Sequence, residues 1–75
     1  MERYANMGGN SGIFEYRIES ESICVHFNKG GTYQYTYASA GKDKVEKMKE
    51  LARKGQGLNA YINKVVKKLY SSKDC

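Results

Sequence analysis

Three stretches of the chain alternate between hydrophobic and polar residues with a period of two. They cover 14–18, 23–27 and 33–37, and their hydrophobic positions are Phe14, Tyr16, Ile18, Ile23, Val25, Phe27, Tyr33, Tyr35 and Tyr37. This period is typical of a β-strand that buries one face. The connections at 19–21 and 28–31 are short, which favours antiparallel neighbours. The pattern therefore predicts a three-stranded antiparallel meander.

The hydrophobic period changes to that of a helix after residue 41. A first helix is expected over 42–54 with Val45, Met48 and Ala52 on one face, and Gly55 can end it in a left-handed conformation. A second helix should follow, and its apolar stripe at 3.6-residue spacing consists of Leu58, Tyr61, Ile62, Val65 and Leu69. A sheet and two helices with one apolar face each can bury those faces by packing together. We therefore expect a two-layer α+β domain of order βββαα.

The chain has the length of one small domain. Its 75 residues leave no apolar material for a second core. Residues 1–10 include Gly8, Gly9 and Asn10 and show little periodicity, which is typical of a flexible N-terminal arm. Residues 11–75 are expected to form the folded domain.

The register of the third strand decides where its tyrosines lie. A three-residue turn at 28–30, with Gly30 in the left-handed conformation, places Val25 opposite Tyr33 and all three tyrosines on the core side. A two-residue turn at 29–30 places Phe27 opposite Thr32 and turns the tyrosines outward, where they would resemble sheets that stack unpaired bases. We favour the first register because it assembles one apolar face from all three strands.

Positive charge is concentrated in the second half of the chain. Residues 41–75 contain ten basic and four acidic residues, a formal charge of +6, whereas residues 1–40 contain three basic and four acidic residues, a charge of −1. A one-sided positive field attracts a polyanion or an acidic protein surface. The charge pattern therefore predicts a binding partner of negative charge.

The two helices differ in how their lysines are neutralised. The first helix places acids at helical spacing from its basic residues, in the pairs Asp43–Lys47, Glu46–Lys49, Glu50–Arg53 and Glu50–Lys54. The second has no acidic residue between Gly55 and Tyr70. The candidate contact residues are Lys64, Lys67 and Lys68, assisted by Lys54 and Lys73. The alternative is that lysines near a helix C-terminus only complement its dipole and keep the protein soluble.

The cysteines and the single histidine predict no reactive site. Cys24 and Cys75 are expected to be reduced thiols of a cytoplasmic protein, since a disulfide scaffold of this size uses four or more cysteines. Cys24 and His26 supply at most half a zinc site, and they lie too far apart on a strand for a nucleophile and its base. We expect no metal, no cofactor and no enzymatic activity. Neither a signal peptide nor a membrane span is indicated.

Three short motifs follow one another along the chain: Ser11-X-Ile13-X-X-Tyr16, then Val25-X-Phe27 with Gly31-X-Tyr33-X-Tyr35, then Gly55-X-X-Leu58-Asn59-X-X-Ile62. Together they resemble the KTSC domain, a short module found alone in bacteria and phages and also at the C-terminus of some lysyl-tRNA synthetases. The resemblance implies a small α+β unit with an RNA-related role and no established catalytic residues. Asn59 is expected to satisfy free backbone donors where the second helix begins.

These observations predict a small non-catalytic binding module. The leading hypothesis is that the basic second helix contacts the phosphate backbone of RNA or DNA. The rival is a protein-interaction module, such as a small phage-type inhibitor that docks on an acidic surface of a nucleic-acid-handling enzyme. An exposed edge, on the first or the third strand, could also add to a partner's sheet or form a homodimer.

Overall fold

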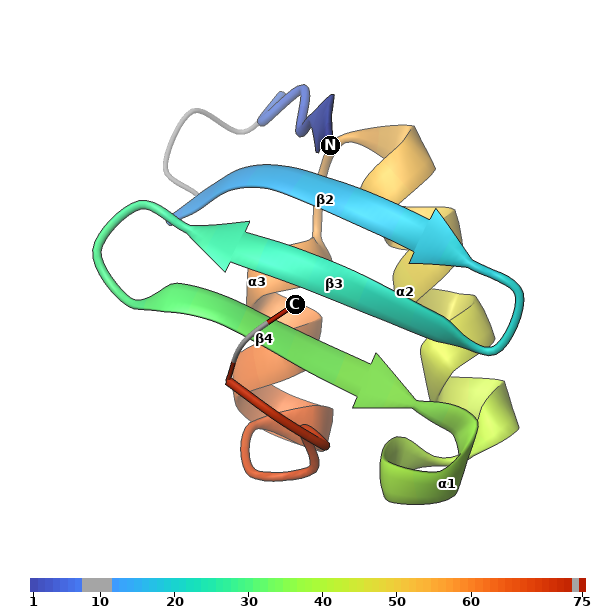
Figure 1. The fold of residues 1–75 in the computed structure, drawn as a ribbon. Helices are drawn as coiled ribbons and strands as arrows, with labels where there is room; N and C mark the ends of the chain where they lie inside the picture. The colour runs from blue at the N-terminus through green and yellow to red at the C-terminus, as the bar shows by residue number, and fades with distance from the viewer. Residues whose placement is uncertain (8–11, 74) are drawn as a thin grey trace.

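The computed structural model describes residues 1–7, 12–73 and 75 as two layers, an antiparallel sheet with helices on one face (Figure 1). The sheet has four strands in the order β1-β2-β3-β4. Their bounds are β1 Glu2–Arg3, β2 Ile13–Glu19, β3 Ser22–Phe27 and β4 Gly31–Thr36. The helical elements are α1 Tyr37–Ala40, α2 Lys42–Lys54, α3 Leu58–Tyr61 and the π-helix η1 Ile62–Val66. The predicted α+β class is confirmed, but the predicted count of three strands is wrong.

The favoured register of the β3–β4 hairpin is confirmed. Val25 pairs with Tyr33 and Phe27 pairs with Gly31, which leaves the three residues 28–30 in the turn. The glycine with positive φ is Gly31, at +81°, and not Gly30 as expected. Tyr35 is 1% exposed in the core. The predicted third strand was too long by one residue, because Tyr37 begins α1, where Thr36 caps the helix by accepting a hydrogen bond from the backbone of Ser39.

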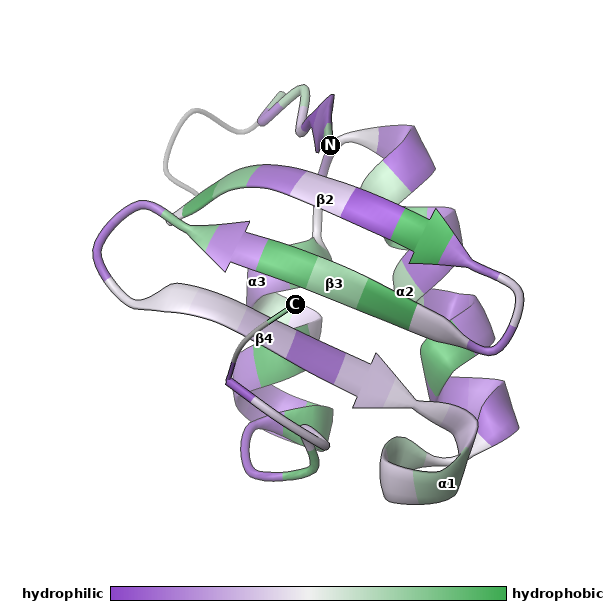
Figure 2. Ribbon diagram, viewed as in Figure 1, coloured by the Kyte–Doolittle hydropathy of each residue, from purple (hydrophilic) through white to green (hydrophobic). Residues whose placement is uncertain are grey.

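The core depends on tyrosine as well as on aliphatic residues. Figure 2 shows β3 with several strongly hydrophobic positions, whereas β4 is pale to purple. Even so, β4 contributes the buried ring of Tyr35, one of the largest fully buried side chains of the described residues. A tyrosine ring buries a large apolar area while its hydroxyl lowers its hydropathy value. Hydropathy alone therefore underestimates how much β4 contributes to the core.

The first residues of the chain belong to the folded domain, which corrects the expectation of a flexible arm. Glu2 pairs with Tyr16 and Arg3 with Glu15, so β1 covers part of the edge of β2. The next residue, Tyr4, is 3% exposed, and its hydroxyl accepts a hydrogen bond of 3.3 Å from the backbone N–H of Leu58. Residues 8–10 of the predicted arm lie outside the described residues.

The helix predicted over 42–54 is confirmed as α2, with Val45, Met48 and Ala52 buried as expected. Gly55 ends it at a φ of +82°. A Cβ at Gly55 would lie 2.6 Å from the Cβ of Ala5, so the helix end is also a close contact with the N-terminal segment. Two requirements, conformation and space, therefore favour glycine at this position.

One lysine of α2 is buried, which the charge pattern did not predict. Lys49 is 4% exposed, and its Nζ donates to the carbonyl oxygen of Ser20 at 3.0 Å and pairs with Glu46 at 2.8 Å. The Glu46–Lys49 pair was predicted. Lys47, expected beside Asp43, pairs instead with Glu50 at 3.3 Å. Hydrogen bonds from Lys49 and Tyr37 lower the pKa of Glu46.

The second predicted helix is shorter and wound differently than expected. Leu58 and Ile62 are buried as predicted, but the next buried side chain is Val66, whereas Val65 is 39% exposed and Leu69 is 38% exposed. Val66 lies four residues after Ile62, a spacing that keeps both side chains on one helix face, and η1 is wound as a π-helix over Ile62–Val66. The buried position therefore advances from 65 to 66, and the helix ends before Leu69.

The last residues return across the outer face of the sheet, opposite the helices (Figure 1). Ser72 forms an antiparallel bridge with Gln34 on the edge of β4. Cys75 then forms a disulfide with Cys24 of β3. The expectation of two reduced thiols is therefore wrong. The sequence separation of 51 residues gave no sign of the pairing, because only the folded topology brings the two cysteines together.

Candidate nucleic-acid interface

A cavity of about 570 Å³ opens between the β3–β4 hairpin and the end of η1. Four aromatic side chains and Ile62 form its apolar lining, and the aromatic residues are Phe27, Tyr33, Tyr35 and Tyr70. Its polar side chains come from the hairpin turn and from η1 and the residues after it; they are Asn28, Lys29, Asn63, Lys67 and Lys68. The described lining residues thus combine an aromatic interior with three cations and no carboxylate.

The aromatic rings pack edge to face along the cavity. The ring centroids of Phe27 and Tyr33 lie 5.5 Å apart, those of Tyr33 and Tyr70 4.9 Å apart, and those of Tyr35 and Tyr70 6.5 Å apart, with interplanar angles of 75° to 89°. In an edge-to-face pair the edge of one ring meets a face of the other, so each contact covers part of one ring face and no face of the ring that supplies the edge. Tyr33 and Tyr70 are half-buried, so parts of their rings remain accessible.

The hydroxyl group of Tyr35 is neutral at ordinary pH. Burial, followed by the neighbouring phenols of Tyr33 and Tyr70, raises the pKa of Tyr35 to about 12. A neutral phenol can donate and accept hydrogen bonds but adds no negative charge. The positive charge of the surrounding lysines is therefore not reduced by the tyrosine that lies deepest in the cavity.

Lys67 and Lys68 are the predicted site residues that the structure brings to the cavity. Both side chains are exposed, and no described carboxylate forms an ion pair with either. Lys29 joins them from the hairpin turn. Lys73 lies nearby, with its Nζ 5.7 Å from the ring centroid of Tyr70. These four lysines, which we call the lysine rim, surround the aromatic lining.

Two predicted site residues lie apart from the lysine rim. Lys64 is exposed on η1 but is not part of the cavity lining. Lys54 is in the last turn of α2, where a basic residue complements the helix dipole. Figure 1 shows the end of α2 and the segment after η1 at opposite ends of α3 and η1. The five predicted lysines therefore do not form one cluster.

Sequence reasoning missed Lys29, Asn63 and Tyr70 as cavity residues. Lys29 and Tyr70 are separated by 41 positions and meet only because the hairpin folds over the end of η1. Asn63 follows buried Ile62 in the π-helix. π-Helical turns are frequent at functional sites, but the sequence pattern of 58–69 gives no signal for one. The available signal was Tyr70 itself, an aromatic residue inside a lysine-rich segment.

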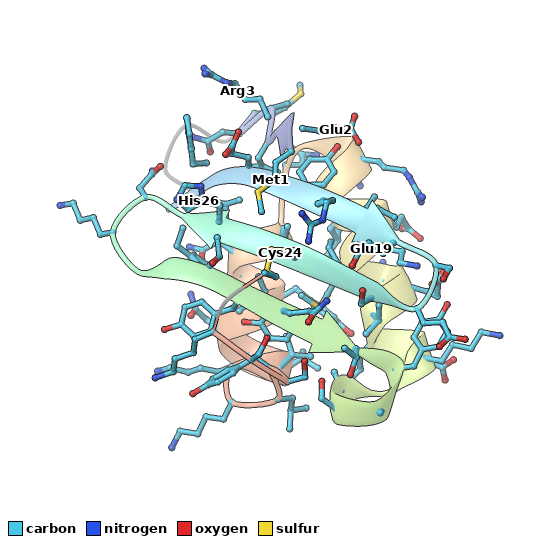
Figure 3. All side chains as sticks on the ribbon, viewed as in Figure 1. Met1, Glu2, Arg3, Glu19, Cys24 and His26 are labelled. Carbon is cyan, nitrogen blue, oxygen red and sulfur yellow. A yellow bond between two sulfur atoms is a disulfide. The ribbon has the colours of Figure 1, made fainter. Side chains whose placement is uncertain are left out.

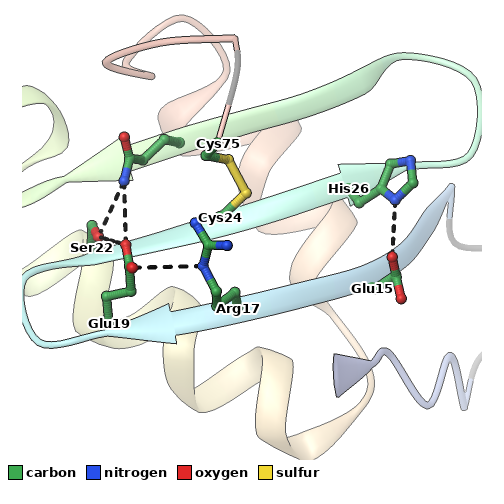
Figure 4. The surroundings of a disulfide bond; sticks show 8 residues. Glu15, Arg17, Glu19, Ser22, Cys24, His26 and Cys75 are labelled. Atoms are coloured by element: carbon green, nitrogen blue, oxygen red, sulfur yellow. Dashed lines mark hydrogen bonds and ion pairs between the residues drawn. A yellow bond between two sulfur atoms is a disulfide. The ribbon is translucent and has the colours of Figure 1, made fainter. Parts of the chain in front are cut away.

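The outer face of the sheet carries the disulfide and a polar network (Figure 4). Glu19 accepts hydrogen bonds from Ser22 at 3.0 Å and from Gln34 at 3.4 Å, and it pairs with Arg17 at 3.6 Å. Figure 3 shows Cys24, His26 and Glu19 on this face. Because the Cys24 sulfur is bonded to Cys75, it offers neither a thiolate ligand nor a nucleophile.

His26 contacts a carboxylate, with its Nδ1 3.3 Å from Oε1 of Glu15. Within residues 1–7, 12–73 and 75, no group of three His, Cys, Asp or Glu side chains is placed to hold a metal ion. The same residues contain no helix with the length and apolar character needed to cross a bilayer.

Both sheet edges that were expected to be free are partly covered by the chain itself. β1 pairs with β2, and Ser71 and Ser72 form backbone hydrogen bonds of 2.6 and 2.9 Å with Gln34 of β4. Such cover limits the addition of a strand from another chain. The structure therefore gives no support to a homodimer formed through either edge.

Asn59 does not supply the helix cap that was expected of it. The described N-cap of α3 is Gly57, which has no side chain, and the backbone N–H of Leu58 donates instead to the hydroxyl of Tyr4.

No family model, curated protein or solved structure matches this chain. The resemblance to the KTSC domain therefore stays a prediction.

Proposed function

We propose that this protein is a small module that binds the phosphate backbone of nucleic acid through the lysine rim. The observation that supports this most directly is the meeting of Lys29, Lys67 and Lys68 at one cavity whose described lining has no carboxylate. Lysine ammonium groups attract phosphates as point charges. Lys64 extends the same basic surface along η1, whereas Lys54 contributes from a separate position.

The number of lysines sets the expected strength of binding. Each neutralised phosphate contributes roughly 0.7 to 0.9 to the slope of log K against log salt. Three or four contacts from the lysine rim therefore give a slope of about −2 to −4, which makes binding weak at physiological salt. Contacts to phosphate position a protein without reading sequence. We expect affinity for many sequences.

The test is a fluorescence anisotropy titration of a labelled oligonucleotide at several salt concentrations. The double variant Lys67→Ala/Lys68→Ala should weaken binding at low salt and reduce the slope by about 1.4 to 1.8. The control is Lys42→Ala/Lys44→Ala, which removes the same charge from exposed positions of α2 outside the cavity. Equal effects of both double variants, or binding that does not respond to salt, would refute the proposal.

A separate experiment addresses the rival partner. The tagged protein is used to capture partners from a host lysate with and without nuclease treatment. Loss of the captured material on nuclease treatment is expected. A protein partner that stays bound after complete digestion would favour an acidic protein surface over nucleic acid.

A further inference from the structure

The geometry points to a base-binding pocket: we propose that the cavity holds one unpaired nucleobase against Tyr33 and Tyr70 while Lys67 and Lys68 contact the adjoining phosphates. This inference rests on the proposed function and names the part of the nucleic acid that is recognised. The lysine rim alone explains attraction to phosphate. It does not explain why the cations surround an aromatic cavity.

The dimensions of the cavity suit a small planar ligand. Its volume of about 570 Å³ lies within the range of roughly 300 to 1,000 Å³ that is usual for small-molecule sites. The base pairs of a duplex are stacked and paired, so a base can enter such a pocket only from a single strand or after leaving its stack. The pocket therefore predicts a preference for single strands over duplexes.

The arrangement of the rings provides the stacking surface. Tyr33 and Tyr70 meet at an interplanar angle of 75° with centroids 4.9 Å apart, so the two rings form a corner and not a closed sandwich. A base that stacks on a face of one ring presents its own edge to the other ring. Stacking of one base on an aromatic side chain typically contributes about 5-fold to 150-fold in affinity.

The polar lining residues distinguish a nucleotide from an apolar anion such as a fatty acid. Asn28 lines the cavity from the hairpin turn and Asn63 from η1. An amide side chain offers both donors and an acceptor, which match the edge of a base but have no partner in an alkyl chain. The positively charged lysines of the cavity lining complement the negative charge of a phosphate group.

The decisive experiment compares oligomers that differ only in their bases, using disulfide-intact protein. Octathymidylate is titrated beside an abasic octamer with the same number of phosphates and beside a duplex of the same length. We expect the octathymidylate to bind at least 10-fold more tightly than the abasic octamer and more tightly than the duplex. Equal binding of the octathymidylate and the abasic octamer would overturn the base pocket but leave the phosphate function intact. Absence of binding by all three would overturn both.

A matched pair of variants locates the base. Tyr70→Leu removes the ring, whereas Tyr70→Phe keeps the ring and removes only the hydroxyl. Affinity for octathymidylate should fall about 10-fold in Tyr70→Leu and stay within about 2-fold in Tyr70→Phe, with the abasic octamer unaffected in both. A Tyr70→Leu variant that folds and keeps full preference for the octathymidylate would contradict the proposal.

If Tyr70→Leu does not fold, the wild-type protein still gives an answer. Thymidine 5′-monophosphate is added while the ring protons of Tyr33 and Tyr70 are followed by NMR. Ring-current shifts of both tyrosines are expected, with smaller changes in the half-buried Tyr61, which lies outside the cavity lining. Shifts confined to lysine signals would place the phosphate at the rim and refute entry of the base.

Discussion

Reduction of the Cys24–Cys75 disulfide frees a loop whose ends are 51 residues apart in sequence. In the chain-entropy account, closing a loop of this size removes about 14 cal/mol/K from the denatured state, which stabilises the fold by about 4 kcal/mol at 25 °C. A domain of 75 residues has a total stability of roughly 4 to 11 kcal/mol. The disulfide should therefore supply at least a third of the stability of this protein.

The assay is urea unfolding followed by far-UV circular dichroism, with and without a phosphine reductant. For a slope of about 1 to 2 kcal/mol/M, we expect reduction to lower the unfolding midpoint by about 2 to 4 M. The control is Cys75→Ser, which cannot form the bond. Its midpoint should match that of the reduced wild-type protein and should not respond to the reductant.

Two outcomes would refute this reasoning. If the reduced protein unfolds within about 1 kcal/mol of the oxidised protein, loop closure in the denatured state is not the main contribution. If Cys75→Ser is far less stable than the reduced wild-type protein, the side chain at 75 contributes by packing against the sheet. The slope provides a further check, because a crosslinked denatured state exposes less surface and should give a smaller value.

Three further predictions follow from features of the core and its boundary. Gly55→Ala should destabilise the protein by at least about 1 kcal/mol more than Gly31→Ala in thermal or urea unfolding. Both glycines have positive φ, but only Gly55 lies against the N-terminal segment. Equal losses of stability in the two variants would contradict this steric argument. Lys49→Met should lower the unfolding free energy by about 1 to 3 kcal/mol, because it removes the charged hydrogen bond from buried Lys49 to the carbonyl oxygen of Ser20. Lys47→Met on the exposed face should change it by less than about 0.5 kcal/mol. Burial raises the pKa of Tyr35 from about 10 in the unfolded chain to about 12 in the folded protein. Its contribution to stability is therefore complete below pH 10. Between pH 10 and pH 12 this contribution falls by up to about 1.4 kcal/mol per pH unit. Urea midpoints at pH 9 and pH 11 should therefore differ less in Tyr35→Phe than in the wild-type protein, and an identical pH dependence would show that another group is responsible.

The parts of the fold that could be predicted from sequence are those with a strong local period. Alternation fixed the three strands of the meander, and the bounds of α2 agree with the helical spacing of Val45, Met48 and Ala52. The β3–β4 register was predictable because one register alone places the apolar residues of both strands on the same face. Each of these features depends on side chains that are close in sequence.

The features that could not be predicted depend on contacts between distant segments. β1 has two residues and no period of its own, so it exists because β2 offers an unpaired edge. Tyr4 was assigned to an arm although it occupies the core and caps α3. The disulfide likewise required knowledge of which face of the sheet the last residues cross. Local pattern carries no information about any of these pairings.

The candidate site also combines residues that could be predicted from local sequence with residues that could not. Lys67 and Lys68 were selected because their helix contains no acidic residue, and this argument needs only the local sequence. The partners that turn two lysines into a pocket, Lys29 and Tyr70, come from other segments. Tyr33 was correctly placed on the core side, yet its ring also reaches the cavity. The sequence therefore indicated the charge of the candidate site but not its shape.

The π-helical turn of η1 has a consequence for recognising relatives of this protein. Its i→i+5 hydrogen bonds enclose one residue more per turn than the i→i+4 bonds of an α-helix, while Ile62 and Val66 both stay buried. A homologue that lacks one residue there, for example the exposed Val65, can wind the same segment as an ordinary α-helix and still bury its last valine. Correct alignment of such a homologue opens a single-residue gap inside a helix, a place where alignment methods penalise gaps most heavily.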